Sequence, residues 1–320
     1  MGQAKILYRL PLNHKVYFFE EQLGDEIFIV SKFESNKNEP RRIKGKSRPI
    51  NGLDIENFFK NVHLTISENT SSVSEMEYEN MVNLALKNIA ADGFQKVVLA
   101  QTKFKIGNFD YATTFNNLLN TYTNAFVYCF FIDEKMMMGA SPEKLLTLNN
   151  GILHSEALGG TMNNKLFSEK EYSEHQFIKT HIETTLNALS FKYLAKETIT
   201  KASGNLSHLF TAFEIEPKTL KLHQQLIEKL HPTPAIGGLP VKESLKFILK
   251  NESFDRLHYA GYLGLFSENN IQVYVNLRCA ECYKNGVRQY AGAGINQGSI
   301  AQDEWDETNR KMQVFGDCLA

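Results

Sequence analysis

The sequence contains no long hydrophobic run, and this absence argues against a membrane-spanning protein. The longest uninterrupted apolar stretch covers residues 125–132, whereas a transmembrane helix needs about 20 apolar residues. The first 15 residues also lack the continuous apolar core of a secretory signal, because Arg9, Asn13 and His14 interrupt them. We therefore expect a cytoplasmic protein that has no membrane partner.

Cysteine is scarce as well. Four cysteines in 320 residues do not form a disulfide framework, and reduced thiols are the simpler interpretation. Cys279 and Cys282 form a C-x-x-C pair, but zinc would need two further ligands and the chain has no second such motif. A thioredoxin-type pair lies at a helix N-terminus, whereas the segment VYVNLRCAECY is typical of a strand. We interpret the pair as structural.

Neither sign of charge predominates. The formal net charge is −1, so no overall basic field would attract nucleic acid or anionic lipid. The hydrophobic fraction of 42% is typical of a globular protein, and 320 residues are enough to bury a substantial core. No repeat, low-complexity tract or linker follows residue 70. The sequence therefore predicts a single domain over residues 1–320, with an N-terminal part at 1–70 and a core at 71–320.

The N-terminal part gives few structural signals. Residues 15–20 and 26–33 are β-rich, and Gly24-Asp25 between them is typical of a hairpin turn. The segment 35–49 is rich in Asn, Lys and Arg, which predicts an exposed loop.

Hairpin-linked strands and amphipathic helices follow. A helix is expected to begin after Ser74, with Glu77 early in it and Gly93 beyond its end. Turn signals occur at Asn149-Asn150-Gly151 and at Asn285-Gly286. Helices are expected at 74–93, 110–122, 168–195, 219–230, 241–251 and 302–319, and strands at 96–106, 125–132, 135–140, 261–267, 271–283 and 287–293. Because the strands are grouped instead of alternating with helices, we expect an α+β fold of large antiparallel sheets with helices packed outside.

Two of the expected helices carry acidic residues at the spacing of one helix face. Each set occupies positions i, i+3 and i+7. The sets are Glu171, Glu174 and Ile178 in one helix, and Glu304, Glu307 and Lys311 in the other. A solvated acidic face is the plain alternative, because helix surfaces commonly carry such charges.

Two observations favour a functional interpretation of these faces. Apolar residues crowd the first helix around His175, and the glycine-rich segment YAGAGINQGS precedes the second. The amides of such a segment suit an anion near a helix N-terminus. Two facing acidic pairs need a cation between them, and ligation by oxygen alone favours Mg²⁺.

Nine segments, in order over residues 96–311, resemble the chorismate-utilising enzyme family. They are KVVLAQ (96–101), GASPEKLL (139–146), ALGGT (157–161), KEYSEH (170–175), LSHLFT (206–211), HPTPAIGGLP (231–240), HYAGYLG (258–264), VNLRCAE (275–281) and GAGINQGSIAQDEWDETNRK (292–311). The family includes isochorismate, salicylate, anthranilate and aminodeoxychorismate synthases. The resemblance implies an aminodeoxychorismate synthase-like fold of layered antiparallel β-sheets, a chorismate-binding domain with its catalytic core at 71–320 and a variable part at 1–70.

The resemblance also assigns roles to individual residues. Lys96 would activate water for attack at C2 of chorismate, and Glu143 would protonate the departing C4 hydroxyl. The family's magnesium ligands correspond to Glu174 and Glu307, supported by Glu171 and Glu304. The remaining site positions, which bind substrate, are Gly160, Thr161, His208, Tyr259, Arg278, the Gly292 amide and Lys311.

Each role has a structural alternative. Lys96 opens an apolar strand and would be an ordinary surface lysine if its stem alone were covered; a lysine base must be desolvated or near other cations. An unpaired Arg278 among apolar strand neighbours would be unfavourable, so a carboxylate partner is expected. Glu143 needs a raised pKa to donate a proton. His208 is either a core histidine or a neighbour of the leaving group.

Within the family, the nucleophile favours isochorismate synthase, an isomerase. Ammonia-using relatives typically have a non-basic residue where this chain has Lys96, and Gly159-Gly160 leaves no lysine before Thr161 as in the aminodeoxychorismate branch. HPTPAIGGLP resembles the isochorismate version of its loop. No glutamine amidotransferase subunit is therefore expected, and a monomer is expected. Salicylate synthase and a non-catalytic chorismate-binding protein remain alternatives.

Three positions depart from the family pattern. Gln101 stands where arginine is usual, Met162 opens a stretch that is commonly more basic, and Ala301 stands where proline is frequent. None of them removes an assigned catalytic residue. The sequence does not distinguish menaquinone from siderophore biosynthesis.

Overall fold

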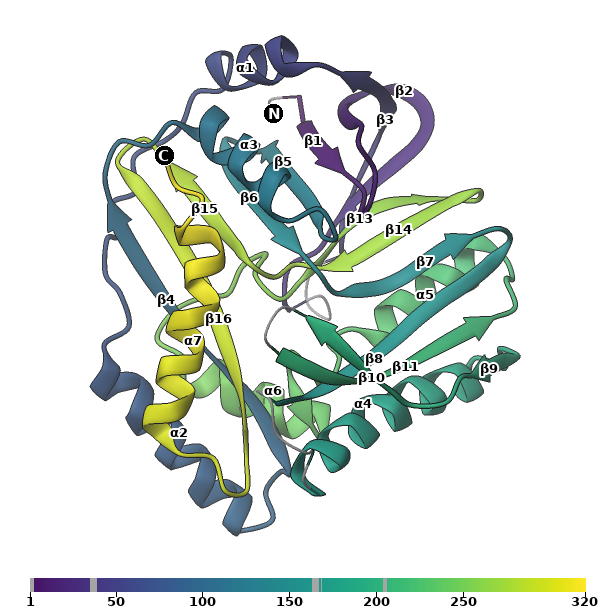
Figure 1. Ribbon diagram of the computed structural model, residues 1–320, viewed down its shortest axis with the longest axis vertical. Coiled ribbons are helices and arrows are strands. Elements are labelled where there is room, and N and C mark those ends of the chain that lie inside the picture. The colour runs from purple at the N-terminus through teal and green to yellow at the C-terminus, as the bar shows by residue number, and fades with distance from the viewer. Residues whose placement is uncertain (1–2, 35–38, 163–166, 168, 204–205) are drawn as a thin grey trace.

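The computed structural model describes residues 3–34, 39–162, 167, 169–203 and 206–320, and within these residues sixteen strands join into one sheet in which every registered pair is antiparallel (Figure 1). The first eight strands are β1 (Lys5–Arg9), β2 (Val16–Val30), β3 (Arg41–Ile50), β4 (Lys96–Ile106), β5 (Phe126–Ile132), β6 (Lys135–Ser141), β7 (Lys144–Asn149) and β8 (Ile152–Met162). The other eight are β9 (Tyr193–Ala195), β10 (Ile199–Ser203), β11 (Leu206–Ile215), β12 (Gly238–Leu239), β13 (Tyr262–Ser267), β14 (Asn270–Val275), β15 (Cys279–Tyr283) and β16 (Gly286–Asn296).

The sheet runs in the order β10-β11-β8-β7-β14-β13-β2-β1-β5-β6-β15-β16-β4-β12, with β3 paired to β2 and β9 paired to β11. The expected α+β class with antiparallel sheets is confirmed, and the pairs link all strands into one sheet. β1 and β2 lie inside this order between β13 and β5, so the N-terminal residues are integral to the sheet.

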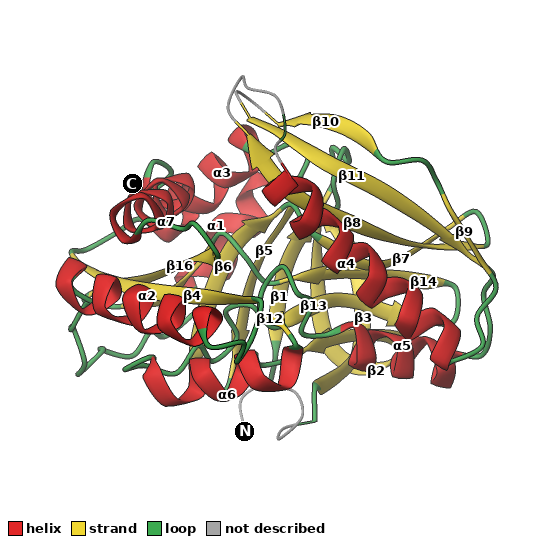
Figure 2. Cartoon of the chain, turned by 90° about the horizontal axis from the view of Figure 1, so that it is seen from below, coloured by secondary structure: helices red, strands yellow, loops and turns green. Residues whose placement is uncertain are grey.

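Seven helices accompany the sheet within the described residues. They are α1 (Gly52–Lys60), α2 (Glu75–Ala90), α3 (Tyr111–Thr121), α4 (Glu169–Ala188), α5 (Leu220–Leu230), α6 (Val241–Asn251) and α7 (Ala301–Gly316). Figure 2 shows α4 running along β8 and β11, whereas α2 and α6 lie near β4. None of these helices combines the length and apolarity that a bilayer span requires.

Local signals predicted most of the core elements correctly. Ser74 accepts from the backbone of Glu77 and the Glu77 side chain accepts from Ser74, which is the capping box expected at the start of α2. Asp110 caps α3 by accepting from the amides of Ala112 and Thr113. The two hairpins expected at Asn149–Gly151 and Asn285-Gly286 connect β7 to β8 and β15 to β16.

The N-terminal predictions were wrong in two respects. Residues 15–33 do not form a hairpin around Gly24-Asp25; β2 continues through them and has an irregularity between Glu21 and Glu26 where it pairs with β3. Most of the expected loop at 35–49 belongs to β3, and residues 35–38 lie outside the described part. Gly24 instead allows β2 and β3 to approach each other closely, because a Cβ at Gly24 would lie 2.3 Å from the carbonyl oxygen of Gly45.

The strand expected over 271–283 is interrupted. β14 ends at Val275 and β15 begins at Cys279. At this interruption the Asn276 side chain forms two hydrogen bonds: it accepts one from the Tyr128 hydroxyl and donates one to the His258 carbonyl oxygen, 2.8 Å away. Arg278 has φ of +51°, a left-handed conformation that costs roughly 1 kcal/mol or more for a residue with a side chain. It therefore belongs to a bend at the start of β15, not to a strand interior.

The hydrophobic core covers both faces of the sheet. The larger cluster joins β1, β2, β4, β13 and β14 to α2, α4, α5 and α6, with large rings such as Tyr78, Phe126 and Tyr274 fully buried. The smaller cluster packs α1 and α3 against β5, β6 and β15 and contains Cys129, Cys282 and Cys318. All four cysteines are buried free thiols, and burial raises the pKa of Cys279 and Cys282.

Close packing sets the position of α4, the first acidic helix. A Cβ at Gly159 would lie 2.7 Å from the Ile178 side chain and 3.3 Å from Cα of His175. The missing side chain at Gly159 thus lets α4 approach β8. His175 is buried against β11, where its Nε2 lies 2.8 Å from the Thr211 hydroxyl.

Candidate active site

A cavity of about 510 Å³ brings together side chains from both acidic helices and from several strands. Its volume is in the range of small-molecule sites. Eleven of the thirteen positions predicted from the sequence line it: Lys96, Glu143, Glu171, Glu174, His208, Tyr259, Arg278, Gly292, Glu304, Glu307 and Lys311. The other two, Gly160 and Thr161, belong to β8, but only their backbone is described.

The register of β4 against β16 positions Lys96. Lys96 is opposite Asn296, and Val98 is opposite Gly294; paired residues of neighbouring strands project to the same face. A Cβ at Gly294 would lie 2.9 Å from Cε of Lys96, so the glycine leaves the space in which the lysine side chain lies. Lys96 is only 6% exposed, which supplies the desolvation expected of a lysine base.

Glu174 is the nearest anionic partner of Lys96. The Lys96 amine lies 3.4 Å from Oε1 of Glu174, and the side-chain amide of Asn296 donates to the same oxygen over 2.8 Å. Glu174 is thus held by two donors, one from β4 and one from β16.

Lys311 of α7, the second acidic helix, also lines the cavity. Lys311 pairs with Glu307 at 2.6 Å and donates to the carbonyl oxygen of Gly292 over 2.9 Å. Glu171 and Glu304 are 9% and 8% exposed. The plain alternative, an acidic face in solvent, is therefore wrong for these two residues.

The Gly292 backbone faces away from β4. Gly292 is opposite Ala100, whose amide donates to Glu252 and not across the ladder, so this is a non-hydrogen-bonded pair. The N–H and C=O of Gly292 hence both point toward the side of β15, and β15 begins too late to reach them, because Ala280 pairs with Gln289. An amide in this position is directed to the cavity.

Arg278 brings a cation to the cavity that forms no ion pair within the described residues. Its guanidinium lines the cavity, and no carboxylate in the described residues forms an ion pair with it. Burial lowers the pKa of Arg278, opposed in part by Tyr122, Tyr259 and Glu307. The carboxylate partner expected from the sequence is therefore absent from the described chain, and an anionic ligand would provide one.

Glu143 has the electrostatic environment of a proton donor. Desolvation and the nearby charge of Glu156 raise its pKa to about 7, although Lys96 and Lys311 act in the opposite direction. A carboxyl with this pKa carries its proton over much of the range around neutrality. This agrees with the raised pKa that the sequence interpretation required.

His208 also lines the cavity, from β11. Burial lowers its pKa, and the cations Arg278, Lys311 and Lys201 lower it further. The neutral imidazole is thus the favoured form. The histidine is part of the cavity wall, and this agrees better with a neighbour of the reacting groups than with a core histidine.

The acidic side chains suit a hard cation held partly by its ligand. Four carboxylates from α4 and α7 share the cavity, and oxygen ligands are those that Mg²⁺ prefers. In the described residues, no three acidic, histidine or cysteine side chains are gathered closely enough to form a ready-made cage. Mg²⁺ commonly binds through one or two carboxylates, waters and substrate oxygens, so these residues fit it.

Two of the departures noted in the sequence, Gln101 and Ala301, are not among the residues that line the cavity. Gln101 is buried and donates to the Thr308 hydroxyl over 2.6 Å, which ties β4 to α7. Ala301 is the first residue of α7, where proline is also well tolerated. The side chain of Met162 lies outside the described residues.

Sequence analysis missed Gly294, Asn296 and Lys201. Gly294 and Lys201 line the cavity, and Asn296 lies behind it in contact with Glu174. Gly292, Gly294 and Asn296 follow one another at the two-residue period of a strand face, a signal that would have placed all three together. Nothing comparable marks Lys201, because its position depends on the pairing of β10 with β11.

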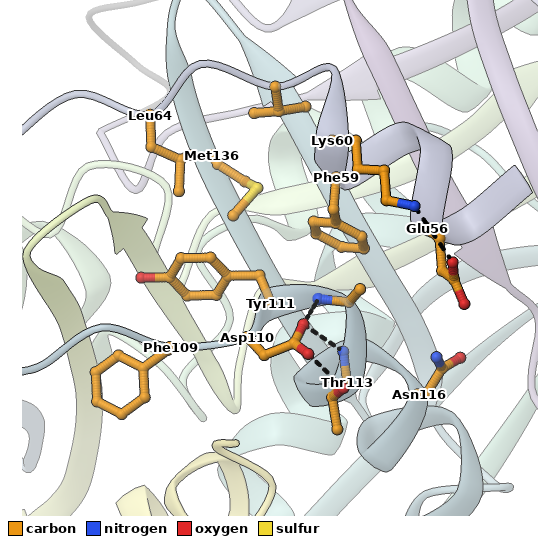
Figure 3. Close-up of a pocket in the computed structure, with 12 residues that line it drawn as sticks. Glu56, Phe59, Lys60, Leu64, Phe109, Asp110, Tyr111, Thr113, Asn116 and Met136 are labelled. Atoms are coloured by element: carbon orange, nitrogen blue, oxygen red, sulfur yellow. Dashed lines mark hydrogen bonds and ion pairs between the residues drawn. The ribbon is translucent and has the colours of Figure 1, made fainter. Parts of the chain in front are cut away.

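A second cavity, of about 400 Å³, lies between α1, α3 and β6 (Figure 3). Charged side chains in its lining interact with residues nearby in the sequence: Asp110 caps α3, and Lys60 pairs with Glu56 at 3.6 Å. The remaining lining includes Phe59, Phe109 and other apolar side chains. It lacks the converging acid, base and cations of the first cavity, which is the better candidate for chemistry.

The sequence of this chain is similar to a known protein family and to characterised enzymes. Residues 27–320 match the family described as chorismate binding enzyme. The isochorismate synthase EntC of Escherichia coli strain K12 is 30% identical over 301 residues, which cover 87% of this chain and 76% of that protein. The isochorismate synthase MenF of the same strain is 29% identical over 280 residues, covering 78% of this chain and 62% of its own length.

Solved structures share the fold. The structure of the menaquinone-specific MenF of Escherichia coli matches with a TM-score of 0.81 and 20% identity, covering 98% of this chain and 88% of that chain. Anthranilate synthase component I of Streptococcus pneumoniae matches with a TM-score of 0.74 and 16% identity, over 98% and 92% of the two chains. At these identities the likeness establishes the fold.

The raised pKa of Glu143 predicts a pH-dependent stability. Its pKa rises from an ordinary 4.5 to about 7 on folding, so its stabilising effect is complete below 4.5 and is lost as pH rises through 7. Glu143→Gln should therefore match the wild type near pH 4.5 and exceed it by roughly 1–3 kcal/mol above about pH 8. Urea unfolding at both pH values measures the difference.

The matched control for this experiment is Glu214→Gln, because Glu214 pairs with Lys196 at 2.8 Å outside the cavity. It should show no gain in stability at high pH. Equal stability of Glu143→Gln and the wild type above pH 8 would show that Glu143 is not a desolvated acid.

Proposed function

The chain belongs to the chorismate binding enzyme family, and from this premise we propose that it is an isochorismate synthase that converts chorismate to isochorismate with Mg²⁺. The observation that carries the proposal is the convergence of Lys96, Glu143 and both acidic helix faces on one cavity. EntC and MenF, both named isochorismate synthases, are the relatives that support this product.

Lys96 and Glu143 would perform the proton transfers. The neutral amine of Lys96 takes a proton from water as the water oxygen bonds to C2 of chorismate. The ring double bonds shift, the bond from C4 to its hydroxyl breaks, and Glu143 gives its proton to the departing oxygen. One water enters and one leaves, so the product is an isomer. The buried position of Lys96 supports its assignment as the base, and the pKa of about 7 of Glu143 suits an acid near neutral pH.

The cationic side chains would hold the two carboxylates of chorismate. Arg278 lacks an ion-pair partner in the described chain and provides two parallel donors for a carboxylate. The Gly292 amide faces away from β4 next to Lys311, which donates to the Gly292 carbonyl oxygen. Tyr259, 4% exposed and stacked on Tyr290, forms a rigid wall beside them.

Glu174 and Glu307 would bind Mg²⁺, with Glu171 and Glu304 supporting them. When bound, the ion would neutralise a substrate carboxylate and fix its orientation. The protein's part is to hold one carboxylate on each of two helices that are distant in sequence. Lys96 and Lys311 each pair with one of these carboxylates, so a cation bound there would compete with both lysines.

Water as the nucleophile separates this proposal from the ammonia-using relatives. A general base such as Lys96 is needed to activate water and is not needed for ammonia. The proposed enzyme therefore needs no amidotransferase subunit, and we further propose that it is a cytoplasmic monomer. MenF is described as menaquinone-specific, and a Vibrio cholerae relative as vibriobactin-specific; either pathway is compatible with the proposed product.

Incubation of the purified protein with chorismate and Mg²⁺ tests the proposal. We expect isochorismate to accumulate, identified by chromatography and mass, because the cavity supplies a base and an acid for one water exchange. Salicylate and pyruvate formed without an added lyase would instead identify a salicylate synthase. Binding of chorismate without any turnover would identify a non-catalytic chorismate-binding protein.

Lys96→Ala tests the base. Turnover should fall at least about 100-fold, which is the usual contribution of a general base, while chorismate affinity stays within about threefold because other residues hold the carboxylates. Steady-state kinetics and equilibrium binding separate the two effects. Lys196→Ala, which removes a lysine paired with Glu214 outside the cavity, is the control; a fully active Lys96→Ala protein rules out this role.

Glu307→Gln tests the metal ligand. Loss of one charged oxygen should raise the Mg²⁺ concentration for half-maximal rate about tenfold or more. Asp306→Asn is the matched control, because Asp306 is exposed, lies one residue away and does not line the cavity. An unchanged Mg²⁺ titration in Glu307→Gln contradicts the ligand assignment.

A further inference from the structure

Asn296 lies behind the cavity and touches it only through another residue. It is 8% exposed and is the last residue of β16, directly opposite Lys96 on β4. Its side-chain amide donates to Oε1 of Glu174 over 2.8 Å, and Asn296 is not itself part of the cavity lining. The observed contact through which Asn296 can act on a bound ligand is its hydrogen bond to Glu174.

The orientation of the Asn296 amide is fixed by a neighbouring turn. The Ser299 hydroxyl accepts from the Asn296 backbone amide at 3.2 Å and donates to the Asn296 side-chain oxygen at 3.4 Å. Because that oxygen faces Ser299, the amide nitrogen faces Glu174. Ser299 is also buried, at 8% exposed, so water does not readily compete for these contacts.

The two oxygens of Glu174 consequently have different surroundings. Oε1 accepts from Asn296 and lies 3.4 Å from Lys96, whereas Oε2 has no hydrogen-bond or ion-pair partner among the described residues. Glu174 lines the cavity, and its side chain is 16% exposed. Oε2 is therefore the oxygen available to a ligand in the cavity.

We propose that Asn296 is a positioning residue that holds Oε1 of Glu174 so that Oε2 is presented to the divalent cation. A neutral amide suits this task better than a second cation, because it orients the carboxylate without cancelling the charge that attracts the metal. It also limits Lys96 to one of the two oxygens. This inference depends on the proposed function for one point, which is that the bound cation is Mg²⁺.

Asn296→Leu tests the proposal, because leucine has a similar volume and no donor. Calorimetric titration of the full chain with Mg²⁺, alone and with chorismate present, should give an affinity about tenfold lower than that of the wild type, as is usual when a partner of a metal ligand is removed. Asn251→Leu is the matched control: it removes an asparagine that donates to the Phe247 carbonyl oxygen and does not line the cavity, and it should leave Mg²⁺ affinity unchanged.

A kinetic readout distinguishes positioning from a general structural defect. If Asn296 acts through the metal ligand, kcat of Asn296→Leu at saturating Mg²⁺ recovers to near the wild-type value, and only the half-saturating Mg²⁺ concentration rises. A structural defect lowers kcat at every Mg²⁺ concentration. In a Glu174→Gln background, Asn296→Leu should cause no further loss of Mg²⁺ affinity, because the two residues act as one unit.

Ser299→Ala provides a second variant in case Asn296→Leu does not fold. It leaves the amide in place without its orienting partner and should lower Mg²⁺ affinity in the same direction by a smaller factor. Unchanged or higher Mg²⁺ affinity in the Asn296 or Ser299 variants overturns the proposal, as does a wild-type chain that binds no Mg²⁺ under either condition. A wild-type chain that binds Mg²⁺ but forms no isochorismate refutes the proposed function and leaves the affinity comparison to decide on Asn296.

Discussion

The fixed position of β4 is the constraint on which the site depends. One edge of β4 pairs with β16 at eleven register positions, from Lys96–Asn296 to Ile106–Gly286. The other edge is held by the buried ion pair of Glu252 and Arg256, which bonds the amide of Ala100 and the carbonyl oxygen of Val98. Because side chains alternate along a strand, a slip of one residue would turn Lys96 out of the cavity. A buried ion pair adds little net stability against apolar packing, whereas its hydrogen bonds to Ala100 and Val98 are satisfied only in this register.

Local signals in the sequence predicted most of the elements and failed where long-range pairing decides. The Ser74–Glu77 capping box and the Asn285-Gly286 turn act within a few residues, so they are readable without the fold. Gly24 gave the same signal as a turn, yet it permits the close approach of β3 to β2 at Gly45. A glycine marks a place where a side chain does not fit. Whether a turn or a neighbouring strand excludes that side chain depends on contacts that sequence spacing does not contain.

For the candidate site too, the sequence predicted which residues share one helix but not which distant segments meet. Helical spacing placed Glu171 with Glu174 and Glu304 with Glu307, and both pairs line the cavity. Family resemblance, not spacing, connected the two helices, which are more than 100 residues apart in the chain. The contact of Asn296 with Glu174 escaped both approaches, since it arises from a strand register and a helix position that only the folded chain brings together.

Charge balance in the cavity links the acid, the cation and the substrate of the proposed reaction. Five glutamates and four basic side chains (Lys96, Lys201, Arg278 and Lys311) line the cavity; with Glu143 protonated and Lys96 neutral, as the proposed reaction requires, four negative charges face three positive ones. Chorismate carries two carboxylates and Mg²⁺ carries two positive charges, so binding both leaves this net charge unchanged, whereas binding either alone shifts it by two charges in a desolvated space. Each ligand should therefore favour the other. Ionisation of Glu143 would add a further negative charge to this space, and the desolvation that raises its pKa opposes that ionisation, which is the condition that its proposed role as proton donor requires.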